Sequence, residues 1–404
     1  HVRSRRQRQM CIRDRRIAAP FCASPPWPAR LEIVAGRQKA IKLGSAFVAG
    51  AETTLDQAID AAALALARSR HVLVTGLDAD ANAVRSAHHL ARGCGGVIDH
   101  AGSGRIYPFL SAFRDHGLVM GVASEVRRRA DRVLVVGADA ATLHPGFLES
   151  LAKTAPDLPT PLEGPRRLFW LGPESSPCAI PAMVQPEFAA CPPHRLTEAL
   201  AILRAGLKGH RHGSGPLGEA DQARLLAFVQ GARFGAVVWA AAATDAIGNE
   251  MAAGLVDDLN TERRFTCVPL LPDDGAYGAA LLSTSITGFP LRVSYAGPAP
   301  HHDPYAFDGM RMIAQGECDL VLAVSGRAEI FEGSHIAIGP AFRPDAAGIV
   351  IRAAVPDRPV YYQPQLGSFG QSATAEQPAG TAMHQVLRAL ERAVRQQVSA
   401  EGRP

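Results

Sequence analysis

The clearest strand signal in the chain is Ala130-Asp-Arg-Val-Leu-Val-Val-Gly137-Ala-Asp139, within a segment that continues to Phe147. Four consecutive apolar residues, Val133 to Val136, lie between a charged pair and a glycine, which is typical of a strand buried on both faces of a parallel sheet. Gly137 and the residues after it predict a turn at the carboxyl end of that strand, where open α/β sheets bind ligands. A second copy of the pattern, Cys318-Asp-Leu-Val-Leu-Ala-Val-Ser-Gly326, predicts two related α/β halves.

The composition is that of a globular protein with room for more than one domain. The chain has 404 residues, of which 47% are hydrophobic and 20% charged, and such a length supports two or three cores. No apolar run approaches the ~18 residues that a membrane span needs. The 7 cysteines are scattered, so local spacing offers no zinc or iron–sulfur site, and we expect free thiols in a reducing cytoplasm.

The first sixteen residues carry the positive charge of the chain. They hold seven arginines and one acid out of totals of 42 basic and 38 acidic residues, so 35 basic and 37 acidic residues remain in the rest of the chain. Residues 9–15, Gln-Met-Cys-Ile-Arg-Asp-Arg, match the translation of a transposon adapter used in sequencing libraries. We therefore expect residues 1–16 to be a non-native basic leader, with a nucleic-acid-binding arm or an organelle transit peptide as the alternatives.

Turn-rich stretches divide the remaining chain into predicted domains. Ten prolines between Pro156 and Pro193 exclude a long helix, and only residues 167–171 predict a strand there. The glycine-rich stretch from Gly206 to Gly218 has the composition of a linker. The predicted segments are an N-terminal segment at 17–50, a first α/β domain at 51–214, a second α/β domain at 215–345, and C-terminal strands with an amphipathic helix at 346–404.

The first α/β domain begins with a clear helix signal. Thr54, with a glutamine three positions later, predicts a capping box, and a strand at 71–75 follows, ending at Gly76. A helix from Asn82 to Ala91 then closes at Gly93-Cys-Gly-Gly96. These glycines do not complete the G-x-G-x-x-G motif and end a helix instead of opening one, so we predict no nicotinamide dinucleotide site.

A series of short motifs follows in order along the chain: Gly76 after a strand, Gly95-Gly-Val-Ile-Asp99, the segment from Asp131 to Pro145, Leu259-Asn260, Tyr277, Thr287-Gly-Phe-Pro290 and Ile313-Ala-Gln-Gly-Glu-Cys-Asp319. This series resembles the B subunit of formylmethanofuran dehydrogenase, a molybdopterin oxidoreductase. Each motif alone is weak, but the collinear series covers residues 55 to 330. The resemblance implies an α/β fold with two related Rossmann-like parallel-sheet halves of molybdopterin-oxidoreductase type, and a smaller C-terminal region.

The resemblance also implies a cofactor that this sequence does not suit. In the dehydrogenase, the B subunit holds tungsten or molybdenum on two pterins with a thiolate or selenolate ligand, and an iron–sulfur cluster near its N-terminus. The ligand position falls at or beside Asn82, in the sequence Leu77-Asp-Ala-Asp-Ala-Asn82, and Cys22 stands alone where the cluster motif is expected. Because an amide does not replace a thiolate on a soft metal, we expect the molybdopterin or tungstopterin and the cluster to be lost.

This departure resembles the bacterial version of the family, a formyltransferase/hydrolase complex of methylotrophs that oxidises formaldehyde to formate. There, the resemblance implies, the B subunit keeps the α/β shell without the metal site. A formyltransferase subunit, a zinc amidohydrolase-like A subunit and a C subunit complete the complex, which handles a methanofuran-like carrier. We predict that the chain is this cytoplasmic B subunit and acts in catalysis only within the complex. An active metal-pterin oxidoreductase and another α/β binding module are the alternatives.

No local motif supports independent catalysis, since G-x-S-x-G, H-E-x-x-H and P-loop sequences are missing. We therefore predict no catalytic or metal-binding residue, and no nucleic-acid or membrane partner. A vestigial cofactor cleft is expected at strand ends, formed by Gly76, Asn82, Gly137, Asp139 and His144. The family implies a carrier with an acidic tail, and four arginines are candidates for guiding it electrostatically, with plain surface arginines as the alternative: Arg105, Arg127, Arg128 and Arg292.

Overall fold

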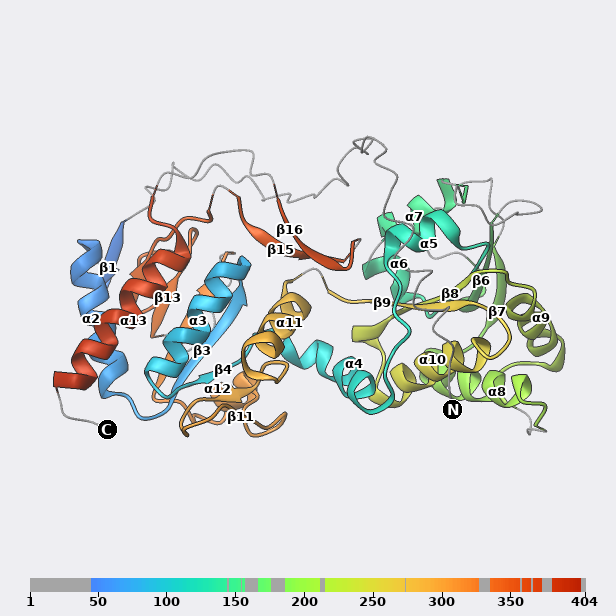
Figure 1. Cartoon of the computed structure of the whole chain (residues 1–404), viewed down its shortest axis with the longest axis horizontal. Helices are drawn as coiled ribbons and strands as arrows, with labels where there is room; N and C mark the ends of the chain where they lie inside the picture. The colour runs from blue at the N-terminus through green and yellow to red at the C-terminus, as the bar shows by residue number, and fades with distance from the viewer. Residues whose placement is uncertain are drawn as a thin grey trace, which may run out of the picture. The chain divides into compact units, whose positions relative to one another are not determined.

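Two β-sheets with parallel strands, both packed against helices, organise the described part of the chain (Figure 1). The expected leader at 1–16 and almost all of the segment at 17–50 lie outside the described residues, as does His144. The computed structural model describes residues 45–143, 145–153, 155–156, 166–175, 186–210, 215–272, 274–326, 335–356, 358–364, 366–372 and 380–400.

The five-stranded sheet is built around the strand predicted at Val133 to Val136. Its strand order is β7-β6-β5-β8-β9, and every neighbouring pair is parallel. The central strand β5 (Arg132–Val136) has fully buried side chains at Val133, Leu134 and Val135, so the predicted strand is confirmed. The other strands are β6 (Arg167–Gly172), β7 (Glu187–Ala190), β8 (Gly235–Ala240) and β9 (Phe265–Leu270).

Side chains of β5 alternate between two cores because helices cover both faces of the sheet. Leu134 and Val136 belong to the main core, together with buried residues of α8, α9 and α10, whereas Val133 and Val135 pack in a second core with residues of α5, α6 and α7. The helices are α5 (Ala123–Arg129), α6 (Asp139–Leu143), α7 (Pro145–Lys153), α8 (Leu196–Leu207), α9 (Glu219–Gln230) and α10 (Ala246–Leu259), with 3₁₀ turns η1 (Pro193–Arg195) and η2 (Ala241–Ala243).

The nine-stranded sheet has the order β11-β10-β4-β3-β12-β13-β14-β1-β2. Its five middle strands are parallel and its two edges are antiparallel. The middle strands are β4 (Val97–Ile98), β3 (Val72–Asp78), β12 (Leu320–Ser325), β13 (Ile336–Ile338) and β14 (Ile349–Ile351). The edge strands are β10 (Val293–Ser294), β11 (His301–His302), β1 (Ala46–Val48) and β2 (Ala51–Thr53), and a separate hairpin pairs β15 (Val360–Gln363) with β16 (Ser368–Gln371).

Helices α2 (Leu55–Arg68), α3 (Ala81–Gly93) and α13 (Met383–Ala400) pack together against the nine-stranded sheet (Figure 1). The predicted capping box is present at the start of α2, where Thr54 and Gln57 bond each other's backbone. Further helices are α4 (Ser103–His116), which packs on α10, α11 (Ala276–Thr287) and α12 (Gly309–Ala314). The predicted apolar face of the last helix is buried, through Met383, Val386, Leu387, Leu390 and Val394.

The strands do not follow the predicted division at residues 214 and 215. The five-stranded sheet combines β5, β6 and β7 from the predicted first domain with β8 and β9 from the second, so the predicted boundary cuts through one sheet. Likewise, β14 and α13 of the predicted C-terminal region join the nine-stranded sheet and its helices. Part of the predicted linker, residues 211–214, lies outside the described residues, and the helices on either side of it, α8 and α9, contact each other. None of the described helices is long and apolar enough to cross a membrane.

Candidate functional site

The order of strands reverses between β3 and β12, which is where ligands bind in open α/β sheets. The predicted strand end at Gly76 is wrong, because β3 continues to Asp78. Gly76 has a left-handed φ of +84°, and a Cβ there would overlap the carbonyl oxygen of Val324 on β12. Just beyond, the Gly326 amide donates to the Asp78 carbonyl oxygen at 2.6 Å. Backbone contacts therefore join β3 and β12 at this point.

Asn82, the expected position of the metal ligand, lies in the first turn of α3. Asp80 is the N-cap, and its Oδ2 accepts a hydrogen bond from the Asn82 amide at 3.1 Å. The Asp80 side chain is buried, and burial raises the pKa of its carboxyl above the ordinary value, an effect partly offset by backbone hydrogen bonds. The helix start thus presents an amide and a capping carboxyl in place of a thiolate.

His100 follows β4 and completes the polar groups at this edge of the sheet. Its Nδ1 accepts a hydrogen bond from the Gly102 amide at 2.8 Å, so its Nε2 carries the proton and donates to the Asp274 carbonyl oxygen at 3.1 Å. The Asp274 carboxylate pairs with Arg105 and caps the Ala276 amide at 3.0 Å at the start of α11. With both ring nitrogens engaged, His100 holds two loops together.

Arg292 is buried in a second polar cluster next to this edge. Its Nη2 lies 2.6 Å from Asp308 Oδ2 and its Nε lies 3.7 Å from Asp99 Oδ2. The guanidinium also bonds Ser103 Oγ and lies 3.8 Å from the centre of the Tyr107 ring. With 6% exposure, Arg292 is neither a surface arginine nor accessible to an acidic carrier, contrary to both sequence-based interpretations.

Burial raises the pKa of Asp99 to about 7, although Arg292 and hydrogen bonds from Gly309 and Ser103 lower it. The side chain of Asp99 is fully buried, and its Oδ1 has no hydrogen-bond partner among the described residues. This carboxyl changes charge near neutral pH, at a place with no access to solvent.

Gly137 and Asp139 occupy the corresponding position on the other sheet. They follow β5, between β6 and β8, where the strand order of the five-stranded sheet reverses. Gly137 has a φ of +81°, and its carbonyl oxygen accepts a hydrogen bond from the buried Trp170 indole at 2.8 Å. Asp139 begins α6 and is exposed. The described residues of the expected cleft therefore fall into two groups, one on each sheet.

The remaining expected carrier contacts also lie on separate elements. Arg105 belongs to α4, and its side chain is 60% exposed beside Asp274. Arg127 and Arg128 belong to the last turn of α5, which leads into the amino end of β5, the opposite end from Gly137. The structure does not gather the four arginines into one basic site.

The cysteine side chains in the described part of the chain do not form a soft metal site either. Burial raises the pKa of Cys94 to about 11, of Cys267 to about 12 and of Cys318 to about 11. These raised pKa values disfavour the thiolate form, which is the form that binds metals. Among the described residues, no three His, Cys, Asp or Glu side chains are grouped to hold a metal ion. The donor set around Asn82 does not fit tungsten or molybdenum bound through sulfur.

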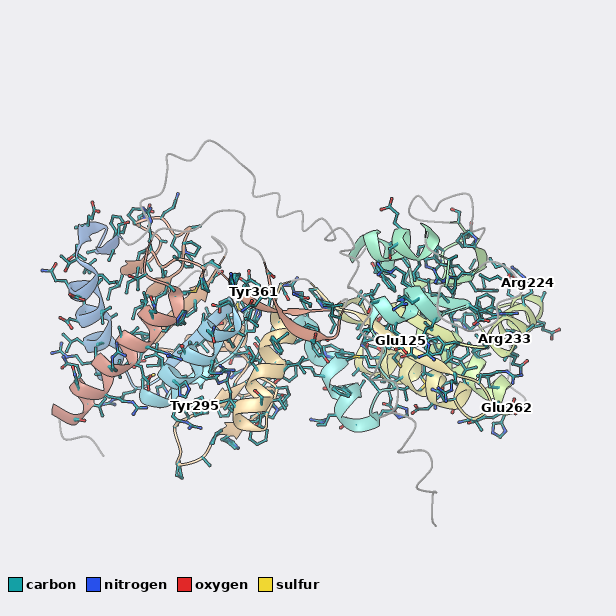
Figure 2. The ribbon with its side chains drawn as sticks, turned by 45° about the horizontal axis from the view of Figure 1, so that its top comes forward. Glu125, Arg224, Arg233, Glu262, Tyr295 and Tyr361 are labelled. Atoms are coloured by element: carbon teal, nitrogen blue, oxygen red, sulfur yellow. The ribbon has the colours of Figure 1, made fainter. Side chains whose placement is uncertain are left out.

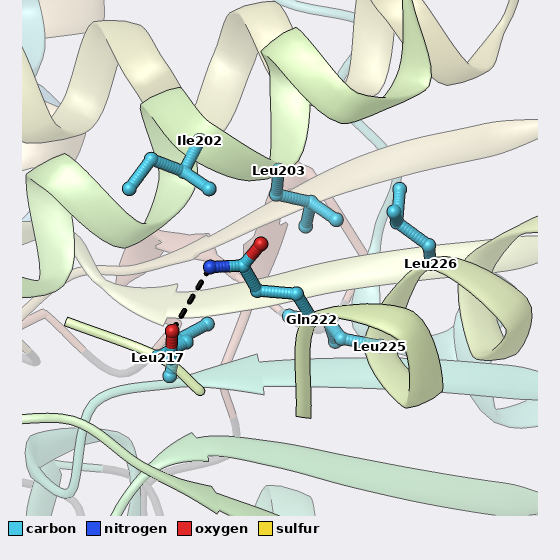
Figure 3. A pocket seen from close by; sticks show the side chains of 6 residues that line it. All are labelled: Ile202, Leu203, Leu217, Gln222, Leu225 and Leu226. Carbon is cyan, nitrogen blue, oxygen red and sulfur yellow. Dashed lines mark hydrogen bonds between the residues drawn. The ribbon is translucent and has the colours of Figure 1, made fainter. Parts of the chain in front are cut away.

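A pocket between α8 and α9 is not a second candidate site (Figure 3). Its volume is about 10 Å³, which is room for one water molecule. The one polar side chain in its lining, Gln222, donates to the Leu217 carbonyl oxygen at 2.9 Å. The other lining residues are Ile202, Leu203, Leu225 and Leu226.

Sequence reasoning missed Asp80 and His100 as members of the site at β3. Asp80 directly before a helix is a recognisable N-cap signal, so this residue could have been found. The role of His100 depends on Asp274, which lies 174 positions further along the chain. No local pattern announces such a contact.

No family model matches the chain. The chain is 30% identical over 330 residues to the Fhc B subunit of the formyltransferase/hydrolase complex of Methylorubrum extorquens (strain AM1), covering 78% of this chain and 86% of that protein. It is 25% identical over 244 residues to the B subunit of a tungsten-containing formylmethanofuran dehydrogenase of Methanocaldococcus jannaschii, covering 58% of this chain and 55% of that protein.

A solved structure gives the same result. The crystal structure of the formyltransferase/hydrolase complex FhcABCD from Methylorubrum extorquens, in complex with methylofuran, contains a chain that superposes with a TM-score of 0.78 at 27% identity. The match covers 88% of this chain and 99% of the other. The α/β fold and the identity with the bacterial relative agree with the expected resemblance. The chain therefore belongs to the family of B subunits of formyltransferase/hydrolase complexes.

Proposed function

We propose that this chain is the non-catalytic B subunit of a formyltransferase/hydrolase complex in the oxidation of formaldehyde to formate. A zinc amidohydrolase-like A subunit, a C subunit and a formyltransferase subunit perform or support the chemistry on a methanofuran-like carrier, in the cytoplasm. Membership of the B-subunit family and the methylofuran found with the related complex support this assignment.

The donor set at the start of α3 carries the proposal. In the metal-containing relatives, the resemblance places a thiolate or selenolate at the position of Asn82. Here that position holds an amide whose backbone N–H is bonded to the Asp80 carboxyl. Nearby, His100 and Asp274 are engaged with backbone groups and with Arg105. None of these groups supplies the sulfur that a soft metal takes in such a site.

The same residues have a structural task in the proposed subunit. Asp80 caps α3, the Asp274 carboxylate accepts a hydrogen bond from the Ala276 amide at the start of α11, and His100 joins the end of β4 to the loop before α11. The bond from the Gly326 amide to Asp78 fastens β12 to β3. A shell held in this way presents a fixed surface to neighbouring subunits and needs no cofactor to order it.

Metal and pterin content test the proposal directly. The full chain is purified together with its partner subunits, and tungsten, molybdenum and pterin are measured against protein, with a tungsten-containing dehydrogenase as the positive control. We expect neither metal at stoichiometric level, while the complex transfers the formyl group and releases formate. Stoichiometric tungsten or molybdenum with pterin, or a chain that never co-purifies with a formyltransferase and an amidohydrolase, would overturn the proposal.

Arg105 is the remaining candidate for guiding the carrier at this edge. Its side chain is exposed and forms an ion pair with Asp274. Arg105→Glu therefore places a second negative charge beside the Asp274 carboxylate. If the carrier passes here with an acidic tail, the variant raises the KM of the complex for the carrier several-fold at low salt and less at high salt. An unchanged KM assigns Arg105 to the surface alone.

A further inference from the structure

Arginines gather at the amino-terminal edge of the five-stranded sheet. Arg132 and Arg167 begin β5 and β6 and stand opposite each other in the sheet register. Arg233 precedes β8, and Arg263 and Arg264 precede β9. Because all five strands are parallel, these amino ends lie at one edge, away from the carboxyl ends that hold Gly137 and Asp139. Figure 2 labels Arg224, Arg233 and Glu262 in this region.

Contacts link several of these residues along the edge. Arg167 pairs with Glu187, whose other oxygen lies 3.6 Å from Arg224. Burial lowers the pKa of Arg132, and the nearby positive charge of Arg167 lowers it further. Asp131 links β5 to β8, since its carboxylate accepts from the backbone amides of Arg233 at 3.0 Å and Phe234 at 2.9 Å.

Helix α5 extends the same surface. Arg127, Arg128 and Arg129 form its last turn, directly before β5, and Arg129 lies 4.7 Å from the centre of the Phe234 ring. With α5 included, nine arginines lie along the edge: Arg127, Arg128, Arg129, Arg132, Arg167, Arg224, Arg233, Arg263 and Arg264. Five acids lie among them: Glu125, Asp131, Glu187, Asp221 and Glu262. By comparison, residues 17–404 together carry 35 basic and 37 acidic residues. The edge is thus positive in a body that is slightly negative. We call it the arginine edge.

Some of these arginines have a purely structural use. Arg132 donates to the Phe228 carbonyl oxygen at 2.8 Å, and Arg263 donates to the Gln230 carbonyl oxygen at 2.7 Å, so both satisfy the end of α9. Arg264 differs, because no carboxylate among the described residues pairs with it. Arg233, Arg263 and Arg264 also line an open groove between the loops before β8 and β9, together with Asn260 and Glu262.

We infer that the arginine edge is a docking surface for an acidic segment of another protein subunit of the complex. The inference rests on the proposed function, because it needs a complex in which the chain is one subunit. Arginine forks bind carboxylates in a bidentate way, and arginine is enriched at protein interfaces. Glu187, Asp221 and Glu262 alternate with the arginines. Because these acids dilute the positive charge, the edge suits a short acidic segment of a protein better than the dense, uniform charge of a nucleic-acid backbone.

Charge reversal in the groove tests the inference. Arg233→Glu with Arg264→Glu is co-expressed with the formyltransferase and amidohydrolase subunits of the same source, and assembly is followed by size-exclusion chromatography and by titration of the purified chain into the remaining subcomplex. We expect the double variant to bind the subcomplex with a Kd at least about a hundredfold higher than that of the wild type. For the wild type, the Kd should rise at least about tenfold when the salt concentration is raised from about 50 mM to about 300 mM.

Two controls separate charge from folding and from remote effects. Arg233→Lys with Arg264→Lys keeps the charge, and we expect it to bind within a few-fold of the wild type. Arg343→Glu reverses an exposed arginine paired with Asp345, between β13 and β14, and should leave the Kd unchanged. Thermal melts of all variants matching the wild type show that the fold is intact.

Three results would overturn the inference. The first is normal assembly of the double glutamate variant. The second is an equal loss of affinity for the partner subunits in Arg343→Glu. The third is a double glutamate variant that keeps its partner subunits but no longer binds an RNA that the wild type binds. Failure of the wild-type chain to assemble at any salt concentration is a different outcome. It would remove the proposed function itself, and the inference with it.

Discussion

Arg292 and Asp308 form an ion pair in which the guanidinium Nη2 lies 2.6 Å from the carboxylate Oδ2, with the arginine side chain 7% exposed. Asp308 is also the N-cap of α12, so the pair connects this helix to the segment after α11. Leu291 and Arg292 both have left-handed backbone angles, with φ of +67° and +49°. Such conformations cost about 1 kcal/mol or more for residues other than glycine. The buried charge contacts offset that cost.

Removal of the Arg292 charge should destabilise the fold strongly. In Arg292→Met, Asp99 and Asp308 lose their partner, and breaking a buried ion pair costs about 3–5 kcal/mol. Urea unfolding of the full chain measures the change. Arg343→Met is the matched control, since its ion pair with Asp345 is exposed and such pairs contribute about 0–1 kcal/mol. Equal losses of unfolding free energy in the two variants would contradict a stabilising role for the buried cluster.

Asp99 should make stability fall as pH rises towards neutrality. Its pKa of about 7 lies above the ordinary value of 3.8, so the folded chain binds this proton more tightly than the unfolded chain does. Its contribution is fully present below pH ~4 and is lost as the pH rises through about 7, with a magnitude of the order of 4 kcal/mol.

The variant Asp99→Asn tests this dependence, because an amide cannot ionise. The difference in unfolding free energy between pH 5 and pH 8 should shrink relative to the wild type. Asp115→Asn, which removes an exposed carboxylate beside Arg114, should retain the wild-type difference. The assignment is wrong if the asparagine variant at position 99 keeps the full pH dependence.

Gly76 should be far less tolerant of a side chain than Gly288. Both have left-handed backbone angles, with φ of +84° and +87°, but a Cβ at position 76 meets the Val324 carbonyl while a Cβ at position 288 meets nothing within 4 Å. Gly288→Ala should cost about 1 kcal/mol for the backbone strain alone. Gly76→Ala should cost about 3 kcal/mol or more, because β3 and β12 must separate. Thermal unfolding of both variants measures the difference in stability. Similar losses of stability would refute the close approach of Gly76 to the Val324 carbonyl.

Local sequence patterns predicted individual elements well. The run from Val133 to Val136 identified β5, the Thr54 capping box identified the start of α2, and the spacing of apolar residues identified the buried face of α13. In each of these cases the signal and the structure it specifies lie within a few neighbouring residues. The β7 strand was missed, because the prolines around it suppress every strand pattern except the one at β6.

Contacts between distant segments were beyond local patterns. The division of strands between the two sheets depends on which strands pair, and β3 pairs with β12 more than two hundred residues later. Arg292 looked like any surface arginine, since its Ser103 partner lies 189 positions earlier in the chain. The expected cleft was split between two sheets for the same reason. The resemblance to a family supplied the function, which no single motif in this sequence carries.

A cysteine placed at position 82 should be reactive and yet fail to bind the metal. Position 82 is partly exposed in the first turn of α3, where the helix dipole lowers the pKa of a thiol. Cys94 ends the same helix and provides an internal comparison, because burial raises its pKa to about 11. We expect the thiol of Asn82→Cys to be alkylated by iodoacetamide at least about tenfold faster than Cys94 at neutral pH.

Elemental analysis after expression with tungstate or molybdate should still find no bound metal, since Asp80, His100 and Asp274 remain engaged with backbone groups. A variant that loads tungsten or molybdenum would mean that one missing sulfur, and not the whole set of surrounding contacts, separates this subunit from its metal-containing relatives.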